Sequence, residues 1–270
     1  MENKNSQLSI KQEKPTLENL LKDTLKDFDR NLIHQFRLEI KKLKAAMLLI
    51  HSVKKSFDIK KKYALIRPLY KDLGAVREIQ LQQDMFQQNG KSYKASFRKK
   101  YKHLLEEELN EREDIVLNHF DESIIKPLNK LKKQVKKALK KLSSNDFKRY
   151  FKIRTYKLKR KLDEIEFSEK KLHDTRTLIK EIKFNARFKQ EMAEKWLAKN
   201  DIDLTILEDL QKCLGEWQDN AILKEKLLQR EGALALQNGE NEALMQFKTS
   251  IEVEDYLIKD KIKKALKLDY

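Results

Sequence analysis

Four side chains suited to anion binding stand close together: His34, Arg37, Lys41 and Lys44. On an α-helix these positions fall within a stripe about 80° wide, because each residue turns the helix by about 100°. Imidazole, guanidinium and ammonium groups in one row can donate charge-assisted hydrogen bonds to phosphate or carboxylate oxygens. The stretch therefore predicts a helical row of donors for an anionic ligand.

An apolar stripe borders this row of donors. Its members follow helical spacing: Ile33, Phe36, Ile40, Leu43 and Met47. Such a stripe packs against other helices, so the donors are expected at the edge of the core. Charge that served solubility alone would have no reason to lie there.

The same pattern recurs once, 139 positions later, as His173, Arg176, Lys180 and Lys183. A second motif recurs in the same order, with Leu73-Gly74-x-x-Arg77-Glu78 matched by Leu214-Gly215-x-x-Gln218-Asp219. Two matched motifs at matched spacing predict an internal duplication with halves near 16–142 and 145–266. We expect about four helices in each half, with the two donor rows facing each other across a pseudo-twofold axis.

Composition favours an all-α fold. Of the 270 residues, 5 are Gly, 3 are Pro and 38% are charged. This composition is typical of long helices, and no alternating strand pattern of useful length occurs. A hydrophobic content of 40% is enough for a core. We expect one domain over 1–270, made of two pseudo-symmetric four-helix bundles, with a flexible lead-in at 1–14.

Charge favours a polyanionic partner. The formal net charge is +17 and the isoelectric point is near 9.6, which suits nucleic acid, a phosphate polymer or an acidic membrane surface. Residues 121–161 hold 16 Lys or Arg against 3 acids, whereas residues 201–255 hold 13 acids against 5 bases. The single cysteine, Cys213, excludes an intramolecular disulfide and gives no basis for a thiolate metal site.

Further basic residues are candidates for the wall of a groove. They are Lys42, Arg187, Lys130, Lys133, Lys137, Arg154, Lys157 and Lys161. For the lysines of 126–140 and the basic face of 154–161, a solvated outer face with aliphatic stems over apolar surface is an equally good interpretation.

The ordered motifs resemble a known family. H-x-x-R-x-x-x-K-x-L-K, L-G-x-x-R-E, H-x-x-R-x-x-x-K-x-I-K and L-Q-x-x-L-G-x-x-Q-D together resemble the CHAD domain, the conserved histidine α-helical domain, over roughly residues 17–235. Each motif alone is weak, and the combination is specific. The chain differs by using Lys41, Lys42 and Lys44 where the family often has Arg, and Glu78 where it often has Asp.

The resemblance implies a basic central groove or pore that binds inorganic polyphosphate, and we expect this binding to be non-catalytic. The family's binding residues map onto His34, Arg37, Lys41, Lys44, His173, Arg176, Lys180 and Lys183. From the residues we expect no cofactor and no metal. Further expected partners are polyphosphate-metabolising or granule proteins. Lysine keeps the charge but lacks the bidentate fork of arginine, so we expect affinity to depend more on charge density than on phosphate geometry.

Two other functions stay open. Nucleic-acid binding would call for aromatic side chains among the basic ones, to stack bases; the stripes hold only basic donors. A phosphate-processing enzyme would need clustered carboxylates for Mg²⁺, a Gly-rich phosphate loop or an activated nucleophile, and no such motif occurs. With no apolar signal core and no run of about 20 apolar residues, we expect a cytoplasmic protein outside the membrane, associated with polyphosphate granules if the resemblance holds.

Overall fold

Every regular element in the described part of the chain is a helix. A computed structural model describes residues 16–89, 93–163, 168–234, 236–237 and 239–266. Within these ranges the chain forms eleven α-helices and two 3₁₀ helices and no strand, which confirms the all-α class. The predicted lead-in at 1–14 lies outside the described residues.

The helices are more numerous than expected. Residues 16–142 form α1 (Leu17–Asp27), α2 (Arg30–Val53), α3 (Ile59–Ala64), α4 (Arg67–Asn89), α5 (Ala95–His119), η2 (Glu122–Ile124) and α6 (Ile125–Leu139). Residues 145–266 belong to α7 (Ser144–Asp163), α8 (Glu169–Ala186), α9 (Gln190–Ala198), α10 (Leu204–Arg230), η3 (Glu231–Leu234) and α11 (Glu240–Ala265). The described α-helices thus number six and five, where about four per half were expected. One reason is that Pro68 opens α4 in its first turn, where no N–H is needed, and so separates α3 from α4.

Side-chain caps begin several helices. Thr16 accepts a hydrogen bond from the Asn19 backbone N–H at 3.2 Å at the start of α1. The predicted break near 143 is a reciprocal cap: the Ser143 N–H donates to Asp146 Oδ2 at 2.8 Å, and the Asp146 N–H donates to Ser143 Oγ at 3.2 Å. α7 begins at this cap.

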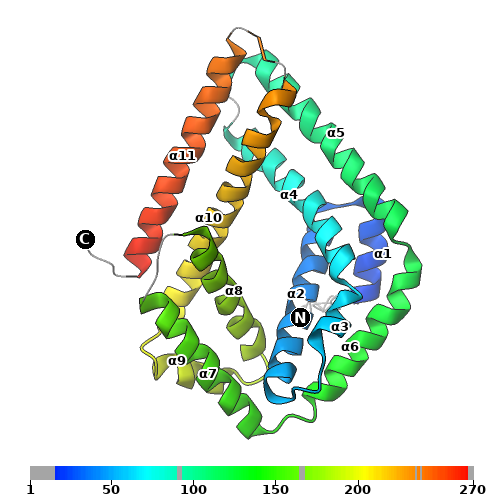
Figure 1. The fold of residues 1–270 in the computed structure, drawn as a ribbon, viewed down its shortest axis with the longest axis vertical. Coiled ribbons are helices and arrows are strands. Elements are labelled where there is room, and N and C mark those ends of the chain that lie inside the picture. The colour runs from blue at the N-terminus through cyan, green and yellow to red at the C-terminus, as the bar shows by residue number, and fades with distance from the viewer. Residues whose placement is uncertain (1–15, 90–92, 164–167, 235, 238, 267–270) are drawn as a thin grey trace, which may run out of the picture.

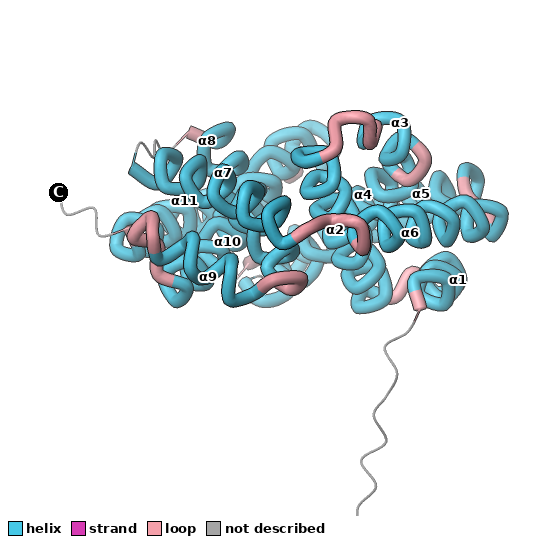
Figure 2. Tube along the Cα trace, turned by 90° about the horizontal axis from the view of Figure 1, so that it is seen from below, coloured by secondary structure: helices cyan, strands magenta, loops and turns pink. Residues whose placement is uncertain are grey.

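Four apolar clusters hold the helices in a closed frame. One lies mainly among α1, α2, α4 and α6, and another among α7, α8, α9, α10 and α11. A third joins α4 and α5 to α10 and α11, and a fourth joins α2 to α7 and α9. Figure 1 shows the resulting arrangement, with α2, α4, α8 and α10 on its inner side, and Figure 2 shows α3, α5 and α6 at one end and α7, α9 and α11 at the other. The two halves are therefore packed together at two separate junctions.

Candidate functional site

The two donor rows lie on α2 and α8, which pack against each other. All five members of the apolar stripe on α2 are buried, as expected. A buried polar contact also joins the two helices: Asn185 on α8 donates from Nδ2 to the Ala45 carbonyl of α2 at 3.0 Å and to the Tyr150 hydroxyl oxygen at 2.7 Å. Because a buried amide that loses its partner is costly, this contact favours one register between the rows.

A pocket of about 560 Å³ lies between α2, α4, α8 and α10. Seven of the eight predicted row residues line this interhelical pocket: His34, Arg37, Lys41, Lys44, His173, Arg176 and Lys180. Other polar or aromatic lining residues are Tyr63, Tyr70, Arg77, Glu78, Thr177, Glu181, Phe184, Gln218 and Asp219. The fold thus brings donors from both rows to one cavity.

The remaining predicted residues lie elsewhere. Lys183 does not line the pocket and donates to Glu208 on α10 at 3.2 Å. None of the eight candidate groove-wall residues lines the pocket either. Lys130, Lys133 and Lys137 are exposed on α6, and Lys157 is exposed on α7.

The other four candidate groove-wall residues are engaged by neighbouring side chains, and one of these neighbours, Glu181, lines the pocket. Lys42 pairs with Glu39 at 2.6 Å, and Lys161 pairs with Asp174 at 3.5 Å. Arg187 lies over the Phe188 ring at 4.7 Å from its centroid. The Nε of Arg154 lies 2.9 Å from the Glu181 carboxylate, so Arg154 contacts a residue that lines the pocket.

Arg37 is held against α4 at Gly74. Its Nη1 donates to the Tyr70 carbonyl at 2.5 Å, and its Cζ lies 4.4 Å from the centre of the Tyr70 ring. A Cβ on Gly74 would overlap this guanidinium, with the Arg37 Cζ only 3.1 Å away. The absence of a side chain at Gly74 therefore leaves room for the guanidinium against α4.

Arg176 lies beside the other motif glycine, Gly215, but less tightly. A Cβ on Gly215 would lie 3.8 Å from Arg176 Nη2, an ordinary contact. The Nε of Arg176 is buried without a hydrogen-bond partner among the described residues, and so is the Nε of Arg77. Buried donors without partners are uncommon in folded proteins. Both side chains line the interhelical pocket.

The two motif histidines have different neighbours. His173 shares a 2.7 Å hydrogen bond between Nδ1 and Gln218 Oε1; with Nδ1 as the donor, Nε2 remains for a ligand. His34 has basic neighbours instead: burial lowers its pKa, and so do the charges of Arg77 and Lys41. An anion in the pocket would oppose that shift.

The pocket concentrates like charges. Burial, with the charges of Arg176 and Lys41, lowers the pKa of Lys180 to about 7. Burial, with Arg37 and Arg176, lowers the pKa of Lys41 to about 8. Asp219 is the carboxylate that stabilises the charged form of both lysines, while burial raises its own pKa. The ligand-free pocket thus holds more positive charge than its carboxylates offset.

Comparison with protein-family models gives a match: the model of the CHAD domain matches residues 16–228, most of the chain. The chain belongs to the CHAD domain family. The match ends within α10, so α11 lies beyond it. Neither the curated proteins nor the solved structures contain a significant match to this CHAD domain.

Several pocket residues of this CHAD domain were not predicted as ligand contacts. Arg77 was recognised only as part of a motif, although its position matches that of Gln218. Tyr63 and Tyr70 come from α3 and α4, and nothing in their local pattern distinguishes them from core aromatics. Their place at the pocket depends on how those helices cross α2.

Two further findings concern the described part of the chain. Nowhere in the described ranges do three or more His, Cys, Asp or Glu side chains gather as metal ligands could. None of the helices with assigned positions is both long and apolar enough to cross a membrane.

Proposed function

We propose that this CHAD domain binds inorganic polyphosphate, a linear polyanion, in the interhelical pocket and acts as a binding module without catalysis. Family membership supports this at the level of the family. The observation that carries it for this chain is that donors from both rows line one pocket. The pocket would be part of the basic groove expected from the sequence, and the two rows would be the products of an internal duplication.

A chain of phosphates suits the pocket better than a single phosphate does. The row on α2 extends over ten residues, which is about 15 Å at about 1.5 Å per residue. A single phosphate would contact only a few of these donors. A polymer places one charge after another along the row, and the charge-assisted hydrogen bonds add up. Polyphosphate also releases counterions on binding, so the affinity should fall steeply with salt.

The second candidate function is nucleic-acid binding, and one observation favours it more than the sequence did. Tyr63, Tyr70 and Phe184 line the pocket, so aromatic side chains do lie among the donors. However, Arg37 already covers the Tyr70 ring, and the Lys44 ammonium lies 4.8 Å from the centre of the Tyr63 ring. Because cations occupy these ring faces, we favour a partner without bases.

Binding measurements on matched variants test the proposal. Lys41→Ala with Lys180→Ala should weaken polyphosphate binding at least about 100-fold, since charge-assisted hydrogen bonds contribute about 1.5–3 kcal/mol each. The control, Lys130→Ala with Lys133→Ala, removes the same charge from exposed positions on α6 and should have a small effect. Equal losses in both pairs would refute a specific pocket.

A competition experiment separates the two candidate ligands. Single-stranded RNA or DNA at the same phosphate concentration should fail to displace polyphosphate from the wild-type protein. Displacement would favour the nucleic-acid function instead. Incubation with polyphosphate and Mg²⁺ should release no phosphate, and steady release would contradict the non-catalytic part of the proposal.

A further inference from the structure

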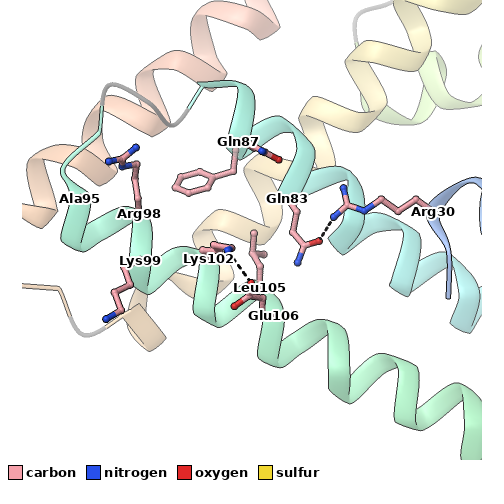
Figure 3. A pocket seen from close by; sticks show the side chains of 10 residues that line it. Arg30, Gln83, Gln87, Ala95, Arg98, Lys99, Lys102, Leu105 and Glu106 are labelled. Atoms are coloured by element: carbon pink, nitrogen blue, oxygen red, sulfur yellow. Dashed lines mark hydrogen bonds and ion pairs between the residues drawn. The ribbon is translucent and has the colours of Figure 1, made fainter. Parts of the chain in front are cut away.

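A second basic cavity lies between α4 and α5, outside the interhelical pocket. It has a volume of about 650 Å³, and we call it the α4–α5 pocket. Four cations line it: Arg30, Arg98, Lys99 and Lys102. Figure 3 shows Arg30 and Gln83 at one end and Arg98 and Lys99 at the other. The sequence motifs gave no indication of this cavity.

The cations of the α4–α5 pocket are only partly neutralised. Arg30 pairs with Asp84, and its Nη2 donates to Gln83 at 2.8 Å. Lys102 pairs with Glu106 at 3.4 Å, one turn further along α5. Arg98 and Lys99 are exposed, and no carboxylate pairs with either within the described residues. An anion in the cavity would therefore meet at least two free cations.

Two buried apolar side chains line the α4–α5 pocket. Phe86 and Leu105 are buried at its base, at 6% and 1% exposure. The Phe86 ring packs on Tyr101 and Phe247, with centroids 4.6 and 5.2 Å apart. Buried apolar side chains beside the cations lower the local dielectric constant, so electrostatic interactions there are stronger than on an open surface.

Arg30 connects the two cavities. At about 100° per residue, Arg77 and Leu81 face the interhelical pocket, whereas Gln83, Phe86 and Gln87 face the other side of α4. Arg30 lies between these two faces, because it bonds to Asp84 and Gln83 while its charge is near enough to help lower the pKa of Arg77. Cations thus continue from Arg77 past Arg30, around the flank of α4.

We propose that a long polyphosphate chain leaves the interhelical pocket at Arg77, passes Arg30 and occupies the α4–α5 pocket, where Arg98 and Lys99 bind it. The extension rests on the proposed function. It makes affinity depend on chain length: a short chain fills the interhelical pocket, and a long chain gains the contacts of the second pocket. The same geometry gives this CHAD domain a preference for long polymers.

The test compares two ligands and two matched variants. The ligands are tripolyphosphate, which is too short to reach both pockets, and long-chain polyphosphate. The first variant, Arg98→Ala with Lys99→Ala, removes two cations from the α4–α5 pocket. The control variant, Lys132→Ala with Lys136→Ala, removes two exposed cations from α6 and makes the same change in net charge.

We expect the first variant to bind long-chain polyphosphate about tenfold more weakly than the control variant, with tripolyphosphate affinity equal in the two. The slope of log affinity against log salt for the long chain should decrease in magnitude by about 1–2, since each lost phosphate contact removes about one released counterion. Circular dichroism and melting should match those of the wild-type protein, because both side chains are exposed.

Each other outcome has a defined meaning. Equal long-chain affinity in the two variants overturns the extension and leaves the proposed function standing. An equal loss for tripolyphosphate in the first variant also overturns it, because the α4–α5 pocket would then not act through chain length. If the wild-type protein binds neither ligand, the proposed function itself fails.

Discussion

The lowered pKa values in the interhelical pocket predict that polyphosphate binding takes up protons. Lys180 and Lys41 have free-state pKa values of about 7 and about 8, since they are buried near other cations. A phosphate chain favours their charged forms and raises both pKa values. The affinity is therefore full below the free-state pKa values and decreases as the pH rises through them.

The size of the effect follows from these values. As the pH rises from about 6.5 to about 8.5, loss of the Lys180 proton accounts for a decrease in affinity of about 25-fold. Loss of the Lys41 proton accounts for a further decrease of about fourfold. The product is about 100-fold. Both ammonium groups keep some contact with solvent, which screens the interaction, so we expect a decrease of about 10- to 100-fold.

Calorimetric titration with long-chain polyphosphate at fixed ionic strength measures this directly. Terminal phosphates titrate in the same pH range, and in a long chain they are only a small fraction of the phosphates. Two buffers with different ionisation heats give the number of protons taken up. Lys180→Arg is the matched control: arginine stays charged at every pH tested, so only the Lys41 contribution should remain.

Two results would refute this reasoning. One is an affinity that does not change with pH in the wild-type protein, and the other is the same pH dependence in Lys180→Arg. The ligand-free protein gives an independent check with the opposite sign. The folded-state pKa values of both lysines lie below the unfolded value of 10.5. Raising the pH from about 7 to about 9 should therefore raise the melting temperature of the wild-type protein. The increase should be smaller in the double variant Lys41→Ala with Lys180→Ala.

Three further predictions concern single residues. Asp219→Asn should raise polyphosphate affinity about tenfold and lower the melting temperature of the ligand-free protein, because it removes the carboxylate that offsets the pocket cations; calorimetry and thermal melting test both, and unchanged affinity would contradict it. Gly74→Ala should weaken binding by displacing Arg37, whereas Gly215→Ala should leave binding unchanged and stabilise α10 by up to about 1 kcal/mol; equal effects on binding would show that the guanidinium has no special place. Asn185→Ala should lower the free energy of unfolding by about 1–3 kcal/mol in urea denaturation, since the Ala45 carbonyl loses its buried partner, and a neutral result would mean that this contact does not hold the α2–α8 interface.

Much of the fold, and seven of the residues that line the interhelical pocket, could be predicted from local patterns. The apolar stripe next to His34 required a helix packed along that edge, and all of its members are buried. Caps such as Ser143 and Asp146 act within four residues, so the start of α7 was readable from the sequence. The repeated motif brought together residues 139 positions apart, and seven of its eight donors line one pocket.

The rest depends on how helices cross, which local patterns do not contain. Lys183 has the same spacing as Lys44, yet it pairs with Glu208, because α10 passes beside that turn of α8. The lysines of α6 could have faced a groove or solvent, and only the packing of Leu128 and Leu131 against α1 and α2 exposes them. Tyr63 and Arg30 reach their cavities through tertiary contacts alone.

The most direct test of the central claim is a crystal structure of the protein with polyphosphate bound. We predict an ordered chain of phosphates between α2 and α8, with oxygens within hydrogen-bond distance of Arg37, Lys41, Arg176 and Lys180. A chain bound instead along the exposed lysines of α6, with the interhelical pocket free of phosphate, would contradict the account.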